Sequence, residues 1–192
     1  RSSDLDEVYG NAPAGAQRIK ESFSLLPDRL YAASKASADH LVQTYHINHA
    51  LPTLVLRSPN TFGPFQFPEK FIPLTIVNAL QGNALPVFGD GSTSRTWLYI
   101  EDLCSAIRIL LHRGVPGEIY NASEQANLTN KELVEKLCLI LDRLSDEAEH
   151  KPHSKLIRFI KERTGQDNRY LLDSTKLQNL GWKPERSFDE SL

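Results

Sequence analysis

The 192-residue sequence contains no methionine, two tryptophans and only two cysteines. Two cysteines are too few for a disulfide framework. Cys104 and Cys138 each stand in an apolar, helix-like pattern, where a free thiol packs as a small hydrophobic group, so we expect both to be buried. No apolar run approaches the ~18 residues that a membrane-spanning helix needs, and we therefore expect no membrane partner.

An excess of one charge is also missing. The chain has 22 Lys and Arg residues against 24 Asp and Glu residues, which gives a net charge of −2. Proteins that follow a phosphate backbone usually carry excess positive charge, so we expect no nucleic-acid partner. His40, His46 and His49 lie close together in the sequence, but their spacing is not that of a metal site, and we expect no metal.

Short apolar segments alternate with longer helical patterns along the chain, which is typical of α/β proteins. A helix is expected from an N-cap at Asp28 to about Asn48, and another is expected to end at Gly114. Thr129 and Glu132 have the spacing of a capping box, which predicts the start of a further helix. The remaining expected elements are a helix at 73–80 and strands at 53–56, 86–88, 96–100 and 118–121, with a glycine turn at 89–91.

Tyr31 and Lys35 are the first candidates for chemistry. On a helix, residues i and i+4 share a face, so the phenol and the ammonium become neighbours. A positive charge ~4 Å from the phenolate stabilises it by about 4 kcal/mol at an effective dielectric constant of about 20. This stabilisation lowers the pKa of the tyrosine by roughly three units. The tyrosine would then ionise near neutral pH and remove a proton from a hydroxyl group. The alternative is an ordinary surface pair, because the spacing alone is common.

Asp6 and Glu7 are the second candidates. Adjacent side chains on a regular strand point to opposite faces, so two neighbouring acids serve one site only where the strand ends. Gly10, followed by Pro13 and Gly15, indicates such an end. Two carboxyl groups in different surroundings can then divide into one proton donor and one proton acceptor. The alternative is a solvated acidic loop.

Seven segments of the chain carry a family resemblance when they are taken together: DEVYG at 6–10, YAASKASADHLV at 31–42, NTFGP at 60–64, FPEK at 67–70, RTWLY at 95–99, GEIYN at 117–121 and LGWKP at 180–184. In this order they resemble the dTDP-glucose 4,6-dehydratase family of extended short-chain dehydrogenases/reductases. The Tyr-Lys spacing is general to that superfamily. The acid pair before Val-Tyr-Gly, together with Phe-Pro-Glu-Lys, is more specific to dehydratases. The resemblance covers nearly all of the chain.

The resemblance implies an α/β fold. Residues 1–62 would be the end of a Rossmann-like, doubly wound parallel sheet that binds NAD, with its N-terminal part missing. Residues 63–192 would form mainly a smaller, mixed α/β substrate-binding lobe, with some segments returning to the first domain. The partners implied are a nucleotide-diphosphate sugar, dTDP-glucose first, and a second copy of the chain in a cytoplasmic homodimer. The two copies would be joined through helices that include the one carrying Tyr31 and Lys35.

The resemblance also implies a reaction with an internal redox cycle. Tyr31 would take the proton of the sugar 4-hydroxyl while NAD+ accepts the hydride from C4. Lys35 would lower the pKa of Tyr31 and hold the nicotinamide ribose. Glu7 would abstract the C5 proton, and Asp6 would protonate the departing C6 hydroxyl. Return of the hydride to C6 would leave a 4-keto-6-deoxy sugar, so the enzyme would be a lyase that releases water.

Binding residues are implied in the same way. Tyr31, Lys35 and Thr61 fall at cofactor contacts. Arginine and lysine suit the oxygens of a diphosphate because they donate charged hydrogen bonds. The substrate contacts implied are Asn60, Glu69 and Lys70 at the sugar, Pro86, Val87 and Phe88 near the base, and Arg95, Asn130, Arg163 and Asp167 at the nucleotide and diphosphate.

Two departures from the family pattern keep alternatives open. Leu5 stands where the family has a hydroxyl residue, usually Thr, that hydrogen-bonds the 4-hydroxyl. No glycine-rich dinucleotide fingerprint occurs, and the first residue is Arg1, so we expect a fragment that binds NAD+ poorly and is inactive by itself. The alternatives are a UDP-sugar epimerase or decarboxylase of the same superfamily, and a relative that binds a nucleotide sugar without turnover.

Overall fold

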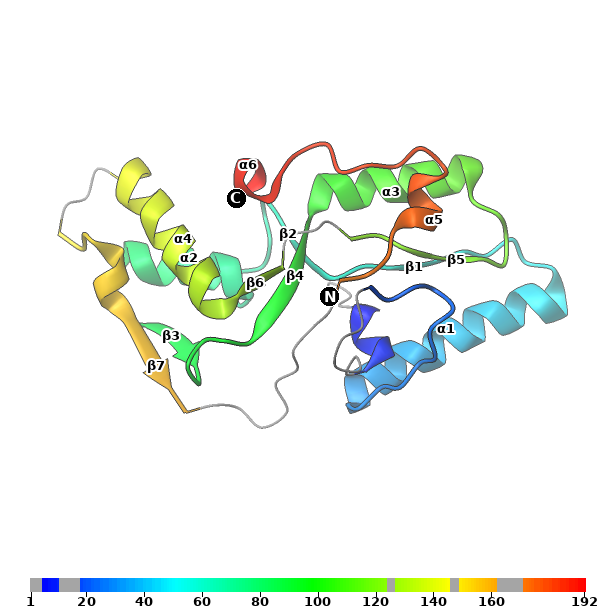
Figure 1. Cartoon of the computed structure of the whole chain (residues 1–192), viewed down its shortest axis with the longest axis horizontal. Helices are drawn as coiled ribbons and strands as arrows, with labels where there is room; N and C mark the ends of the chain where they lie inside the picture. The colour runs from blue at the N-terminus through cyan, green and yellow to red at the C-terminus, as the bar shows by residue number, and fades with distance from the viewer. Residues whose placement is uncertain (1–4, 11–17, 124–126, 146–148, 162–170) are drawn as a thin grey trace. The chain divides into compact units, whose positions relative to one another are not determined.

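The computed structural model describes residues 5–10, 18–123, 127–145, 149–161 and 171–192 (Figure 1). The chain divides into two compact units, which are described one at a time. Unit 1 consists of Arg1–Thr61, Thr96–Asn127 and Arg169–Ser191. Unit 2 consists of Phe62–Arg95 and Leu128–Asn168, with Leu192. Each unit is therefore assembled from segments that are far apart in the sequence.

Unit 1 is built on a parallel strand pair, β1 (Val55–Arg57) and β5 (Ile119–Asn121). Parallel neighbours require a long crossover connection, and α3 (Ile100–Arg113) lies on this one. Thr53 and Leu54 precede β1, and their apolar run continues into the strand. The other elements of the unit are η1 (Leu5–Tyr9), α1 (Leu30–His49), α5 (Thr175–Gln178) and α6 (Phe188–Ser191).

Two groups of buried apolar side chains form the interior of unit 1. One group joins α3 to β5, because Ala106 and Leu110 lie one helical turn apart and pack with Tyr120. Segments near the C-terminus complete it through Leu177 and Trp182. The second group joins η1 to α1 and consists of Val8, Tyr9, Ile19, Ala36 and Leu172. The backbones of Ile19 and Leu172 form an isolated parallel bridge beside this second group.

Unit 2 has its own parallel strand pair, β3 (Leu85–Phe88) and β7 (Ile157–Ile160), which run side by side in Figure 1. Two helices, α2 (Phe71–Leu80) and α4 (Asn130–Leu144), pack against each other and against β3. The short η2 helix (His153–Leu156) leads into β7 and packs on α4. The core of this unit consists of Ala79, Leu85, Val87, Val134 and Cys138.

A third sheet has three strands in the order β2-β4-β6, where β2 is Asn60–Phe62, β4 is Ser94–Tyr99 and β6 is Asn127–Thr129. With helices around parallel strand pairs, the predicted α/β class is confirmed. Among the residues that the structure describes, every helix is too short or too polar to cross a membrane.

The local predictions for helix ends agree with the structure within a few residues. α1 begins at Leu30 with Arg29 as its N-cap, one residue later than expected, and α3 ends at Arg113 before Gly114. The capping box of α4 is confirmed: the Thr129 hydroxyl accepts a hydrogen bond from the Glu132 backbone N–H at 3.1 Å. The Glu132 carboxylate in turn accepts one from the Thr129 N–H at 2.8 Å.

Two other predictions need correction. Cys138 is buried in the core of unit 2, but Cys104 is exposed on α3, so the expectation of two buried thiols was wrong for Cys104. The buried face of α3 is formed by Asp102, Ala106 and Leu110, which leaves Cys104 on another side of the helix. The helix expected at 73–80 begins at Phe71, because a proline fits within the first turn of a helix.

Candidate active site

The acid pair lies on η1, a single turn of 3-10 helix. The sequence indicated a strand ending at Asp6 and Glu7, whereas the structure has this 3-10 turn at the pair. Gly10 closes the turn with a φ of 69°, a left-handed conformation that glycine adopts without strain, and its N–H donates to the Glu7 carbonyl at 3.1 Å. Asp6 is buried, with 3% of its surface exposed, whereas Glu7 is half-buried. The two neighbouring carboxyl groups therefore stand in different surroundings.

Tyr31 and Lys35 lie one turn apart at the start of α1. The Lys35 ammonium is 5.5 Å from the centroid of the Tyr31 ring, so the expected proximity of the two groups is present. Tyr31 is 40% exposed and Lys35 is half-buried. Tyr31 is therefore exposed at the surface of unit 1, and the ammonium lies beside its ring.

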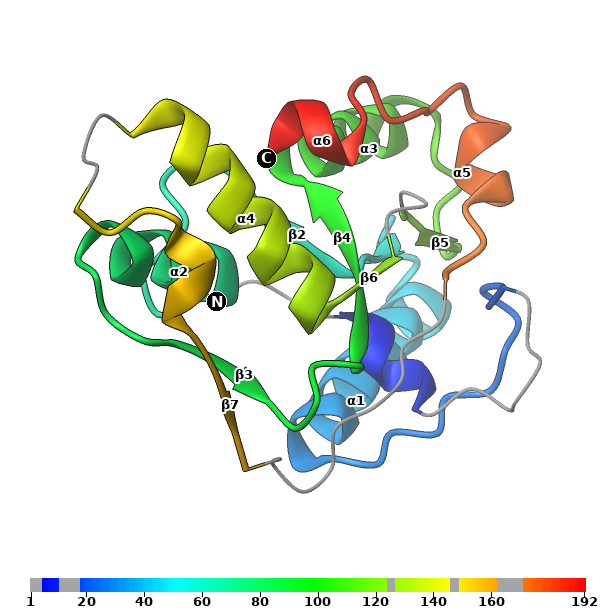
Figure 2. The same cartoon turned by 60° about the vertical axis from the view of Figure 1, so that its left-hand side comes forward.

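The two elements that carry these four residues are packed against each other within unit 1. Both views show η1 lying along the first half of α1 (Figures 1 and 2). Ala32 and Ala36 are buried on this part of the helix, and their small side chains allow close approach. The Leu26 N–H donates to the Val8 carbonyl at 3.1 Å, which ties the chain just before α1 to η1.

Two further predicted residues lie on β2. Asn60 is buried, and its side-chain amide donates to the Thr96 carbonyl at 3.3 Å. Thr61, the predicted cofactor contact, follows it and is also buried. Burial in a three-stranded sheet explains why these polar side chains are held in place rather than free to move with a loop.

Several predicted substrate residues belong to unit 2. Successive residues of a strand face opposite sides, and β3 follows this rule. Val87 is buried in the core of the unit, whereas Pro86 is exposed and Phe88 half-buried on the other side. Lys70 is the N-cap of α2, and the exposed Glu69 precedes it.

The predicted diphosphate anchors are divided among elements. Asn130 is the first residue of α4, buried, and its backbone N–H donates to the Thr93 carbonyl at 2.9 Å. Arg95 is half-buried on β4. Arg163 and Asp167 lie outside the described residues.

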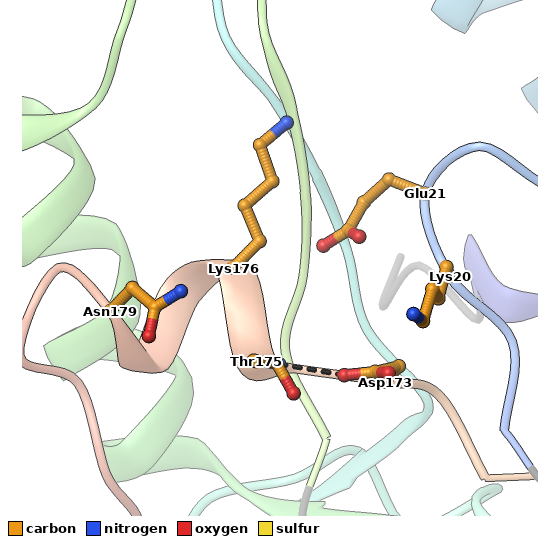
Figure 3. Close-up of a pocket in the computed structure, with 6 residues that line it drawn as sticks. All are labelled: Lys20, Glu21, Asp173, Thr175, Lys176 and Asn179. Carbon is orange, nitrogen blue, oxygen red and sulfur yellow. Dashed lines mark hydrogen bonds between the residues drawn. The ribbon is translucent and has the colours of Figure 1, made fainter.

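A surface pocket of about 280 Å³ also occurs in unit 1 (Figure 3). Three of its charged side chains form hydrogen bonds within the protein. The Lys176 ammonium donates to Glu118 at 2.6 Å, Glu21 accepts from a β5 backbone amide, and Asp173 accepts from the Thr175 N–H at 2.8 Å. None of the sequence-predicted residues lines it. The lining residues are Lys20, Glu21, Asp173, Thr175, Lys176 and Asn179.

Sequence reasoning missed one polar network beside the acid pair. Arg57, at the end of β1, is buried and contacts both Tyr9 on η1 and Asp39 on α1. The sequence held two signals: an arginine directly after the apolar run of β1, and an aspartate four residues beyond Lys35 on a helix. Neither signal reveals that the two charges meet, because 18 residues separate them.

The parallel α/β architecture and the Tyr-x-x-x-Lys helix define a protein with a Rossmann-like fold of the short-chain dehydrogenase/reductase type. Comparison with known proteins narrows this class. The chain belongs to the GDP-mannose 4,6 dehydratase family, which it matches over residues 2–192. The family resemblance seen in the sequence is therefore confirmed.

Individual relatives agree with this assignment. The dTDP-glucose 4,6-dehydratase of Xanthomonas campestris is 40% identical over 188 residues, which are 97% of this chain and 53% of that protein. The crystal structure of DesIV, a dTDP-glucose 4,6-dehydratase of Streptomyces venezuelae with NAD and TYD bound, gives a TM-score of 0.85 at 38% identity over 97% of this chain and 55% of its own. The chain spans about half the length of the curated relatives it matches.

A more distant structure shows how widely the fold is shared. The UDP-glucose 4-epimerase of Thermotoga maritima, solved with UDP-glucose, gives a TM-score of 0.85 at 24% identity over 98% of this chain and 59% of its own. At that identity the likeness concerns the fold alone. The Rossmann-like α/β class is thus confirmed, and the choice of reaction depends on the residues.

Proposed function

We propose that the protein to which this chain belongs is an NAD-dependent lyase that converts dTDP-glucose to dTDP-4-keto-6-deoxyglucose and water. The relatives with the higher identities support this reaction over epimerisation. The observation that carries the proposal is the packing of η1, with its acid pair, against α1, with Tyr31 and Lys35. Epimerisation at C4 requires no elimination of water and so requires no such pair.

Tyr31 is proposed as the base at the sugar 4-hydroxyl. Its ring is exposed, and the Lys35 ammonium, 5.5 Å from the ring centroid, is proposed to stabilise the phenolate through its positive charge. Removing the hydroxyl proton prepares C4 for oxidation. The resulting ketone makes the proton on C5 acidic, which is the condition for the second part of the reaction.

The acid pair is proposed to carry out the elimination, with Asp6 as the proton donor and Glu7 as the base. Asp6 is buried and Glu7 is half-buried, and neighbouring carboxyl groups in different surroundings can divide into a donor and an acceptor. Glu7 takes the C5 proton, the C5–H electrons form the C5–C6 double bond, and the C6 hydroxyl leaves as water with a proton from Asp6. When a hydride is later added at C6, the enolate at C5 would take its proton back from Glu7, which completes the 4-keto-6-deoxy sugar.

The residues present fit a nicotinamide cofactor. Lys35 is half-buried next to an exposed Tyr31, so the ammonium can hold a ribose hydroxyl without leaving the phenol, and Thr61 is proposed as a further contact. When bound, NAD supplies the redox chemistry by accepting the hydride from C4 and returning it to C6. We propose that unit 1 belongs to the cofactor-binding domain.

Substrate binding is proposed for Asn60 in unit 1 and for residues of unit 2. Lys70 and Arg95 offer charged donors for the sugar nucleotide, and Pro86 and Phe88 offer the exposed side of β3 for the base. Arg163 and Asp167 remain part of this proposal from the sequence. The sugar with its nucleotide diphosphate is thus the proposed ligand, with thymine preferred.

We also propose a cytoplasmic homodimer, in which α1 pairs with its copy. One face of α1 exposes Leu30, Ser34, Ala38, Leu41 and Tyr45, spaced three or four residues apart. Leu30 is 94% exposed and Leu41 61% exposed. The small side chains between the large apolar ones let a second helix approach closely. When the same face of both copies forms the contact, the result is a closed dimer with two-fold symmetry.

The experiment is to incubate the full protein with NAD+ and dTDP-glucose and to weigh the nucleotide sugar by mass spectrometry. We expect the loss of one molecule of water. An unchanged mass with an inverted hydroxyl would indicate an epimerase, and release of CO2 from a UDP-uronate would indicate a decarboxylase. Binding of dTDP-glucose without any transient NADH absorbance would indicate a relative without turnover. Parallel reactions with UDP-glucose and CDP-glucose test the preference for thymine.

A further inference from the structure

A buried charge network in unit 1 centres on Arg57, the last residue of β1. Arg57 is 2% exposed. Its Nε donates to the Asp39 carboxylate at 2.8 Å, and its Nη1 donates to the Tyr9 hydroxyl at 2.8 Å. The guanidinium also lies over the Tyr9 ring, 4.8 Å from its centroid. One planar side chain therefore holds two partners at fixed angles, which a flexible ammonium does less well.

The two partners of Arg57 belong to the two elements that carry the proposed chemistry. Tyr9 follows Glu7 by two residues on η1. Asp39 lies four residues beyond Lys35, so it continues the face of α1 that begins with Tyr31. Arg57 thus bridges the turn that holds the acids to the helix that holds the hydroxyl base.

The same end of β1 also holds the front of η1. The Asp6 N–H donates to the carbonyl of Ser58, the residue after Arg57, at 3.3 Å. Both ends of the acid-bearing turn are therefore anchored to two neighbouring residues. A shift of the Arg57 side chain would remove one of the hydrogen bonds that hold the Tyr9 end of the turn, beside the one between Val8 and Leu26.

Tyr9 has a structural role in this network: its hydroxyl forms hydrogen bonds and does not act as a base. Its hydroxyl accepts from Arg57 and donates to the Asn121 side chain at 2.9 Å, and Asn121 donates to the Ile19 carbonyl at 3.0 Å. Burial raises the pKa of Tyr9, against the opposing effect of the Arg57 charge. Tyr9 therefore stays a neutral phenol at physiological pH and keeps its donated hydrogen bond.

We propose that Arg57 is a positioning residue for the elimination of water, because it fixes the turn carrying Asp6 and Glu7 against the helix carrying Tyr31 and Lys35. The proposal rests on the function proposed above and deepens it. The proposal predicts different effects on the two halves of the reaction, C4 oxidation and elimination of water. C4 oxidation depends on Tyr31 and Lys35, which sit on one helix, whereas elimination depends on η1 keeping its place beside that helix.

The first test is Tyr9→Phe in the full protein. This change keeps the ring and the Asp39–Arg57 ion pair and removes the hydroxyl that accepts from Arg57 and donates to Asn121. We expect elimination to slow by about tenfold or more, as a small misplacement of reacting groups does. The appearance of NADH after mixing with dTDP-glucose should change by less than about twofold, because Tyr31 and Lys35 lie on α1 and keep their contacts in this variant. NADH absorbance at the nicotinamide band should consequently persist longer than in the wild type.

The matched control is Tyr120→Phe. Tyr120 is equally buried, its hydroxyl accepts from the Val115 N–H at 3.0 Å, and the Lys176 ammonium lies 4.6 Å from its ring centroid. It thus has the same kind of surroundings as Tyr9, but its side chain belongs to the core group of α3 and not to that of η1. We expect a similar loss in melting temperature for the two variants and a prolonged NADH phase in Tyr9→Phe only.

Arg57→Lys is the second variant. It keeps a positive charge beside Asp39 but loses the planar guanidinium that donates to Asp39 and Tyr9 together. We expect it to prolong the NADH phase as Tyr9→Phe does. Equal slowing of oxidation and elimination in both variants, or the same kinetics in Tyr9→Phe and Tyr120→Phe, would overturn the positioning role. A wild-type protein that releases no water from dTDP-glucose would overturn the proposed function, and this inference with it.

Discussion

Tyr31 differs from phenylalanine by the one hydroxyl that the proposed chemistry needs. Because the ring and its contact with Lys35 are kept, Tyr31→Phe should leave the Kd for dTDP-glucose within about twofold of the wild type. Turnover should fall by about 10²–10⁴-fold, the usual contribution of a general base. Single-turnover kinetics and equilibrium binding with the full protein measure the two quantities.

Tyr45→Phe is the control for this change. Tyr45 is on the same helix and 54% exposed, and it takes no part in the proposed chemistry; it lies on the proposed dimer face, but the change keeps the apolar ring there. Its variant should match the wild type in both measurements. Comparable losses of binding and turnover in Tyr31→Phe would show that the hydroxyl serves binding, and the role of Tyr31 as base would be withdrawn.

At the residue scale, the sequence predicts contacts made within one helix but not contacts made between distant segments. The proximity of Tyr31 and Lys35 follows from helix geometry, because one turn of helix brings them together whatever the rest of the chain does. The contacts of Arg57 have no such local cause. Asp39 is 18 residues away and Tyr9 is 48 residues away, so only the packing of η1, α1 and β1 brings the three side chains together.

At the scale of the element, η1 depends on the glycine that ends it. Gly10 has a φ of 69°, and a Cβ there would lie 1.9 Å from the Leu26 carbonyl oxygen. Gly10→Ala should therefore cost more than the about 1–2 kcal/mol of a left-handed alanine, because backbone must also move. The displaced turn carries the acid pair, so turnover should fall together with the melting temperature.

Gly181→Ala is the matched control for Gly10→Ala. Gly181 also has a positive φ, 96°, but its added Cβ would meet only the end of the Arg113 side chain at 3.0 Å. We expect this variant to lose stability from backbone strain and to keep its turnover. If the two variants lose the same stability and Gly10→Ala keeps full turnover, the close fit of η1 is not required for the reaction.

The α4 helix offers a prediction about pH. Hydrogen bonds from the Thr129 backbone and hydroxyl lower the pKa of Glu132 below its ordinary value of 4.5. A depressed pKa in the folded state means that the capping box stabilises fully above pH 4.5 and loses its effect as the pH falls through the lower folded value. Thr129→Ala should cost about 1 kcal/mol at neutral pH, and the difference from the wild type should shrink in acid.

Melting curves of the full protein at neutral pH and below pH 4.5 measure this difference. Thr44→Ala provides the comparison, because the Thr44 hydroxyl donates to the His40 carbonyl at 2.8 Å within α1 and caps no helix. It should have little effect at either pH. A loss in Thr129→Ala that stays constant as the pH falls would mean that Glu132 plays no part in the cap.

The ends of a helix depend mainly on its own residues, whereas the partner of a strand does not depend on the residues of that strand alone. The capping box and the glycine after α3 are local signals, and the helix ends follow them closely. Strand pairing is not local. The glycine turn after β3 leads toward β4, yet β3 pairs with β7, which lies some seventy residues further along the chain, and β4 joins β2 and β6. Alternation of apolar and polar residues indicates a strand, but it does not indicate which other strand will pair with it.

At the scale of the molecule, the units are defined by contacts that a linear pattern does not contain. Unit 1 combines the first segment with Thr96–Asn127 and with Arg169–Ser191. The buried Leu177 and Trp182 pack with the α3 residues that precede them by about seventy positions. Composition and motif order could indicate the α/β class and the family, because these depend on many short segments at once.

The proposed homodimer gives a prediction at this scale. Leu41 lies in the middle of the exposed face of α1 and would meet the same face of a second copy. Leu41→Glu places a charge in that contact on both sides, and burying unpaired like charges costs several kcal/mol, about enough to separate most dimers at micromolar concentration. We expect light scattering of the full protein to show a dimer for the wild type and a monomer for this variant.

Ile47→Glu is the control, and it decides between a dimer and a general effect of added charge. Ile47 is 78% exposed on the same helix, but lies roughly 120° around the axis from Leu41. The two variants make the same kind of change at exposed apolar positions, so only the geometry of the helix distinguishes them. A dimer that survives Leu41→Glu, or that is lost equally in Ile47→Glu, would mean that this face of α1 does not join the two copies. A dimer lost in Leu41→Glu alone would place the self-pairing surface on the helix that carries Tyr31 and Lys35, and subunit association would then be coupled to the reaction through one element.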